Sequence, residues 1–140
     1  MEVIVEHLGG VQFEIKARQH RVVCDQPFEN GRFDEGLTPP ELLLASLGSC
    51  AGFYAAQYLK KHHLATEGTT VRVFAEKAQN PPRLNDFCIQ IETPSRLSNQ
   101  HHEALEEAVR HCLIHNTLLN QPRIALEVKT SVLEPCHSGV

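Results

Sequence analysis

The chain has 140 residues, of which 41% are apolar and 21% charged, and its formal net charge is −4. This size and balance predict a single domain, residues 1–140, with an ordinary hydrophobic core, and exclude an intrinsically disordered chain. The sequence has no stripe of Lys and Arg, which argues against nucleic-acid binding. The first residues have neither a basic nor an apolar segment of the secretory type, so we expect a cytoplasmic protein.

The first third of the chain predicts three antiparallel strands and a loop. Apolar and polar residues alternate over 11–18, as in a strand with one buried face. Gly9-Gly10 suits a hairpin turn because glycine tolerates positive φ angles. Residues 27–40 contain three prolines and two glycines and predict a loop. The expected strands cover residues 2–8, 11–18 and about 20–25.

A long apolar helix is predicted next. Thr38 can cap its N-terminus, Pro39 and Pro40 fit the first turn, and Glu41 completes a capping box. No charged residue occurs from Leu42 to Leu59, so a membrane span is an alternative. Serines, glycines and a glutamine dilute the apolar character, and small residues recur every three or four positions. We therefore expect a buried helix of a soluble protein against which another element packs closely.

The second half predicts a hairpin, a helix and a strand. Alternating residues indicate a strand over 69–78 and a partner strand around 87–91, across a proline-rich turn. An amphipathic helix is expected over about 99–118, and a last strand over Arg123–Ser131. The order βββ-α-ββ-α-β is that of an α+β fold with antiparallel sheets.

Five cysteines are widely spaced, form no Cys-x-x-Cys pair and are odd in number. They therefore fit neither a disulfide framework nor a zinc ribbon, and indicate reduced thiols in the cytosol. Cys24 and Cys88 alternate with apolar residues in strands and are expected to be structural. Cys136 lies in the C-terminal tail and is expected to be an exposed spectator.

Cys50 and Cys112 are the candidates for chemistry because both lie on core-facing helices. Both could simply be small buried hydrophobic residues. Packing of the two helices could instead bring the sulfurs together, and a lowered pKa would make a thiol reactive. His111, Cys112 and His115 also suggest a metal site. Cys112 is turned about 100° from His111 on a helix, however, and no further ligand is near, so no metal or other bound cofactor is expected.

Two segments resemble the cysteine motifs of the OsmC/Ohr family of thiol peroxidases, TPPELLLASLGSC at 38–50 and AVRHCLIHNTL at 108–118. The order of the predicted elements agrees, so the resemblance covers nearly the whole chain. It implies an intertwined homodimer in which strands of both chains form shared sheets around the buried helix. Each active site is then expected at the interface between the subunits.

The resemblance also implies a peroxidase mechanism. Cys50 attacks the peroxide and becomes a sulfenic acid, which condenses with Cys112 to a disulfide. An external dithiol, lipoyl-linked in some members, then reduces this disulfide. The apolar helix surfaces favour organic hydroperoxides over hydrogen peroxide, which predicts an antioxidant role in stress. The alternative is a non-catalytic protein on the same fold that binds a small molecule or senses redox state.

Two positions depart from the family pattern. Pro40 stands where the family has a glutamate, ten residues before the first cysteine, and Gly9-Gly10 stands where it has an arginine. Glu41 could replace the glutamate. The stand-ins for the arginine, contributed by the partner subunit, are Arg18, Arg21 and Arg32, although such arginines are more often solvated surface cations.

Overall fold

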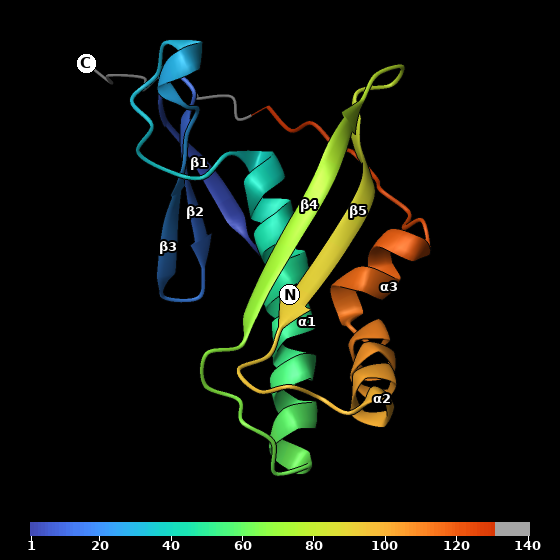
Figure 1. Ribbon diagram of the computed structural model, residues 1–140. Helices are drawn as coiled ribbons and strands as arrows, with labels where there is room; N and C mark the ends of the chain where they lie inside the picture. Colours follow the sequence, from blue (N-terminus) through green and yellow to red (C-terminus); the bar gives the residue numbers. More distant parts are fainter. Residues whose placement is uncertain (131–140) are drawn as a thin grey trace, which may run out of the picture.

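The computed structural model describes residues 1–130 and places two antiparallel sheets beside a long helix (Figure 1). The first sheet contains β1 (Ile4–Gly9), β2 (Gln12–Ala17) and β3 (His20–Cys24) in the order β1-β2-β3. The turn between β1 and β2 uses Gly9 and Gly10, whose φ angles of 137° and 55° cost glycine little. The three predicted strands and the glycine turn are confirmed.

The loop after β3 is tied back to the sheet by Asp25, which is only 1% exposed. Its carboxylate accepts hydrogen bonds from the side chain of Gln12 (3.0 Å) and from the backbone of Gln26 (2.7 Å) and Glu35 (3.1 Å). These donors, the Gln12 side chain first and the Glu35 amide next, lower the pKa of Asp25 despite its burial. The short 3₁₀ helix η1 (Phe28–Asn30) lies in this loop. One buried carboxylate therefore fixes the path of the chain toward the long helix.

The long helix α1 (Pro39–Lys61) starts with the predicted capping box. The Thr38 hydroxyl accepts from the Glu41 amide at 3.4 Å, and the Glu41 carboxylate accepts from the Thr38 amide at 2.8 Å. By length and composition α1 could also cross a membrane, a test that core helices of soluble proteins pass as well. One side of α1 forms the centre of the core, with Leu47, Ala51, Ala55 and Leu59 at 2% exposure or less.

The ribbon of β4 (Thr70–Ala78) and β5 (Arg83–Glu92) lies across α1 (Figure 1). Glycines allow this close approach. A Cβ on Gly48 would lie 3.0 Å from the Val73 side chain, and one on Gly52 would lie 3.4 Å from Val71. The outer face of the ribbon is open to solvent, and it includes Cys88. Cys88, which was expected to be structural, is therefore exposed in one chain, whereas Cys24 is buried.

The single helix expected over 99–118 is divided into α2 (Asn99–Arg110) and α3 (Leu113–Leu119). Between them Cys112 has φ −55° and ψ 127°, which is not helical, and its sulfur accepts from the His115 amide at 3.5 Å. The thiol thus caps the next helix. The buried side chains of α2, Leu105 and Val109, complete the core on α1.

The strand expected over Arg123–Ser131 is not formed within the described residues, where 121–130 have no regular structure. Its predicted inward side chains Ile124, Leu126 and Val128 are 84–91% exposed. A strand needs a neighbour for its backbone groups, and in the described part of one chain this segment has none. Ser131 and the tail with Cys136 lie outside the described residues.

Candidate active site

The structure brings Cys50 and Cys112 together, as the packing of their helices allowed. Cys50 lies on α1 and is partly buried, whereas Cys112 lies between α2 and α3 and is fully buried. The Cys112 thiol lies close enough to Cys50 to shift the pKa of its thiol, and both cysteines are free. The two sulfurs are therefore positioned to form a disulfide with each other, although no disulfide joins them.

The two thiols have opposite pKa shifts. Burial alone would raise the pKa of Cys50, but hydrogen bonds from the Cys112 thiol and from the amides of Ile114 and Leu113 outweigh it and lower that pKa. Burial raises the pKa of Cys112, and so does its hydrogen bond to Cys50. The two thiols therefore titrate as a pair, in which their surroundings favour the thiolate on Cys50 and the thiol on Cys112.

The break in the helix at Cys112 explains why backbone amides of α3 act on the Cys50 thiol. The first N–H groups of a helix have no partner within that helix and bind whatever acceptor lies in front of them. Because α3 starts at Leu113, directly beside α1, the amides of Leu113 and Ile114 are the backbone groups that lower the pKa of Cys50. Neither residue could be recognised as functional from the sequence, because backbone amides have no side-chain signal and the apolar pattern continues smoothly through the break.

Glu41 is held in the first turn of α1, whereas Cys50 lies near the middle of the helix. Nine residues separate it from Cys50, which corresponds to about 14 Å along the helix axis. Its carboxylate accepts from the amide and from the hydroxyl of Thr38, and these two hydrogen bonds lower the pKa of Glu41. Within one chain Glu41 is therefore a helix cap, and its predicted role near Cys50 stays a prediction.

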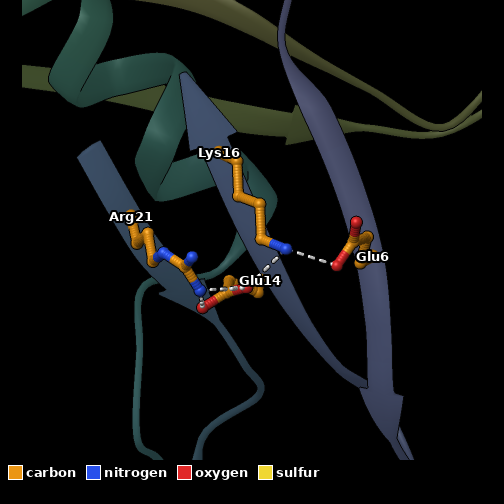
Figure 2. Close-up of polar contacts among 4 residues, drawn as sticks. All are labelled: Glu6, Glu14, Lys16 and Arg21. Carbon is orange, nitrogen blue, oxygen red and sulfur yellow. Dashed lines mark hydrogen bonds and ion pairs between the residues drawn. The ribbon is translucent and has the colours of Figure 1, made fainter. Parts of the chain in front are cut away.

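The three predicted arginines lie on or beside the first sheet, which is away from α2 and α3 (Figure 1). Arg18, with φ 56°, is in the turn between β2 and β3. Arg21 pairs with Glu14 at 3.2 Å, and Lys16 links Glu14 to Glu6 (Figure 2). Arg32 lines a cavity of about 230 Å³. Among residues 1–130 of one chain, no arginine belongs to the groups that hydrogen-bond to Cys50.

The lining of the cavity beside Arg32 concerns the arginine that the family pattern has and that this chain lacks. It is also lined by Gly9 and Gly10, the two residues at the position where the family has its arginine. Of the three candidates, Arg32 thus lies next to the hairpin that carries the family's cation. The sequence distance of more than twenty residues concealed this proximity.

The histidines near Cys112 form no metal centre in the described part of the chain. There, no group of three or more His, Cys, Asp or Glu side chains is arranged to hold a metal ion. His115 contributes its backbone amide to Cys112, while its ring Nδ1 is buried without a hydrogen-bond partner. His111 lies instead 3.8 Å from the carboxylate of Glu107, on the exposed side of α2.

Solved structures share this fold at low sequence identity. An OsmC-like protein from Mycoplasma pneumoniae is 17% identical, with a TM-score of 0.74 over 86% of this chain and 87% of that chain. The organic hydroperoxide resistance protein OsmC from Legionella pneumophila is 15% identical, with a TM-score of 0.64 over 84% of this chain and 89% of that chain. The organic hydroperoxide resistance protein OhrB of Bacillus subtilis is 17% identical, with a TM-score of 0.54 over 86% of this chain and 93% of that chain.

Comparison of the sequence with family models agrees with these structural matches. Curated protein sequences provide no significant match. The family model described as OsmC-like protein matches residues 32–127, which is well over half of the chain and includes both cysteine motifs. The chain therefore belongs to the OsmC-like protein family.

Proposed function

We propose that the protein is a thiol-dependent peroxidase that reduces organic hydroperoxides, with Cys50 as the nucleophile and Cys112 as the resolving thiol. The observation that carries the proposal is the contact between the two sulfurs together with their opposite pKa shifts. A peroxidatic cysteine must be a thiolate, and a resolving thiol must be adjacent and still available. The names of two solved relatives, both organic hydroperoxide resistance proteins, support the substrate class.

The reaction needs two steps on the protein and one reductant. The Cys50 thiolate attacks the terminal peroxide oxygen, the O–O bond breaks, and the alkoxide leaves as an alcohol after taking a proton. Cys50 is now a sulfenic acid. The Cys112 sulfur then attacks the Cys50 sulfur, the S–O bond breaks, water leaves, and a disulfide forms. An external dithiol, such as a dihydrolipoyl group, returns two electrons and two protons and is itself oxidised to a disulfide.

A homodimer belongs to the proposal because one chain leaves its apolar surfaces uncovered. In the most apolar part of α1 only 28% of the residues are buried, and Phe53 is 62% exposed. The extended segment over 121–130 exposes three more large apolar side chains and has no strand beside it. A second copy offers both an apolar helix face and sheet edges. Light scattering at micromolar concentration should give twice the chain mass of 15.7 kDa, and a folded monomer would reject the dimer.

The partner subunit is also the proposed source of a cation near Cys50. Arg32 is the preferred candidate because it lies beside the Gly9-Gly10 hairpin, whereas Arg21 is already paired with Glu14. A guanidinium stays charged when partly desolvated and can bind a thiolate or a peroxide oxygen. Replacing Arg32 with Met should therefore slow the reaction of Cys50 more than replacing Arg18 or Arg21 does.

A non-catalytic binding or redox-sensing protein is the second candidate function. It is favoured by one observation: within the described chain the donors to Cys50 are a thiol and two amides, all of them neutral. Such a site could form the disulfide slowly and signal its redox state without turnover. A single round of oxidation with no steady state would support this function.

Steady-state assays test the proposal. The protein, supplied with cumene hydroperoxide and dihydrolipoamide, should consume the dithiol continuously. Cys50→Ser should abolish turnover, and Cys112→Ser should stop it after the sulfenic acid forms. The matched control is Cys88→Ser, which changes an exposed thiol and should leave the rate unchanged. Wild-type protein that shows no turnover with organic hydroperoxides would overturn the peroxidase function.

A further inference from the structure

Two pairs of adjacent histidines lie where the end of α1 approaches the start of α2 (Figure 1). His62 and His63 directly follow α1, and His101 and His102 belong to the first turn of α2. The rings of His62 and His101 have their centroids 5.4 Å apart, with their planes inclined by 66°. The fold thus brings together two imidazole rings that are far apart in the sequence, at a place separate from the cysteine pair.

The separation of these two rings suits a shared metal ion. Zn²⁺ binds an imidazole nitrogen at about 2.0–2.1 Å, and its four ligands point to the corners of a tetrahedron. Two imidazole rings that bind one such ion therefore have centroids about 5 Å apart. The observed 5.4 Å is close to this value, and because the His62 side chain is exposed, a small rotation brings its ring into place.

Tyr58 holds both rings. Its hydroxyl group and His101 Nδ1 are hydrogen-bonded at 2.9 Å, and its ring lies against that of His62 with the centroids 4.3 Å apart. When His101 Nδ1 carries the proton and donates to the Tyr58 oxygen, Nε2 has the lone pair that a metal ion needs. Histidine ligands in metal sites are oriented by such a contact of the other ring nitrogen, so Tyr58 prepares His101 as a ligand.

The surroundings of the two rings select the kind of ion. The negative end of the α1 dipole favours a cation here, whereas the positive end of α2 and the exposed Lys60 and Lys61 oppose it. Within residues 1–130, no third His, Cys, Asp or Glu completes a group that could hold a metal ion, so water completes the coordination. Binding must therefore come from the two nitrogens and not from local charge, which favours metals that prefer imidazole over Mg²⁺ or Ca²⁺.

We propose that His62 and His101 bind one Zn²⁺ ion and that Tyr58 positions His101 for it. The bound ion joins the end of α1 to the start of α2 and so stabilises the contact between these helices. Because Cys50 lies on α1 and Cys112 directly follows α2, the same contact supports the cysteine pair. The metal site is independent of the proposed peroxidase function and lies outside the residues that carry it.

Calorimetric titration of the reduced protein with Zn²⁺ tests the site. Wild-type protein should bind one ion that is lost in His62→Gln and in His101→Gln, and Tyr58→Phe should weaken its binding roughly tenfold. Zn²⁺ should also raise the melting temperature of wild-type protein but not that of His62→Gln. The matched controls are His63→Gln and His102→Gln, which change the neighbouring histidine of each pair and should bind Zn²⁺ as wild-type protein does.

Three results would overturn the inference: no binding of Zn²⁺ by wild-type protein, binding that is unchanged in His62→Gln, or an equal loss in the control variants. Cys50→Ser removes a thiol that could itself bind Zn²⁺, and it should retain this ion; binding lost there but kept in His62→Gln would place the ion on the thiols. His101→Gln removes the hydrogen bond to Tyr58, so melting without metal checks its fold, and His62→Gln decides alone if that variant does not fold. No step uses a hydroperoxide, so a failure of the peroxidase function leaves this result unchanged.

Discussion

Replacing Cys112 with Ala should slow the reaction of Cys50 with alkylating agents. The Cys112 thiol donates one of the hydrogen bonds that lower the pKa of Cys50, and alanine cannot donate. A hydrogen bond to a charged group is worth about 1.5–3 kcal/mol, and a thiol is a weak donor, so the low end applies. About 1.4 kcal/mol corresponds to a tenfold change, so the alkylation rate at neutral pH should fall roughly tenfold. The amides of Leu113 and Ile114 remain and should preserve the rest of the effect.

Cys112→Ser separates the hydrogen bond from the disulfide. Serine keeps a donor at this position but cannot resolve a sulfenic acid, so Cys50 should alkylate at least as fast as in wild-type protein. The rate is measured as a function of pH by mass spectrometry of the Cys50 peptide, because exposed Cys88 also reacts. Thermal melting checks that both variants fold. If the Ala and Ser variants react equally fast, the Cys112 thiol does not stabilise the Cys50 thiolate, and the reasoning is refuted.

Three further predictions concern the framework of the site. Leu59→Ala removes a fully buried side chain of α1 and should lower the free energy of unfolding by about 2–5 kcal/mol in urea titrations. Gly36→Ala should lower the melting temperature, because the new Cβ would lie 2.1 Å from the Val23 carbonyl oxygen. Asp25 has a lowered pKa in the folded protein, so its stabilising contribution is present at neutral pH and is lost below about pH 4. Asp25→Asn should therefore weaken the pH dependence of stability in acid.

Each of these predictions has a control. For Leu59, the matched change is Leu43→Ala on the exposed side of α1, which should cost much less. For Gly36, it is Gly52→Ala, where the new Cβ would lie 3.4 Å from a side-chain methyl group and not against backbone. For Asp25, the control is Asp34→Asn, which changes an exposed residue of the same loop. Equal effects in any pair would contradict the packing or charge argument for that position.

Much of the fold could be predicted because local signals agreed with the final packing. The capping box fixed the start of α1, alternation identified the paired strands, and Gly48 and Gly52 predicted the close approach of another element. Cys50 and Cys112 were found in the same way, from their places on core-facing segments. These features depend on residues that are close in sequence or on one face of one element.

The remaining features depend on contacts between distant parts of the chain. The break at Cys112 has no signal in the spacing of apolar residues, since Val109 and Cys112 would be buried in one continuous helix and are also buried in the two separate helices. Cys88 lies between apolar residues of β5 and therefore on the opposite, outer face of the ribbon, which has nothing packed on it in one chain. The final strand was predicted from Ile124, Leu126 and Val128, but pairing requires a neighbour that one described chain does not provide.

The most direct test of the central claim is peptide mapping after addition of one equivalent of organic hydroperoxide to the reduced protein. The account predicts a disulfide between Cys50 and Cys112, and in Cys112→Ser a Cys50 sulfenic acid that dimedone traps. Exposed Cys88 should remain a thiol in both proteins. Oxidation that falls mainly on Cys88 or Cys136 while Cys50 stays reduced would contradict the account.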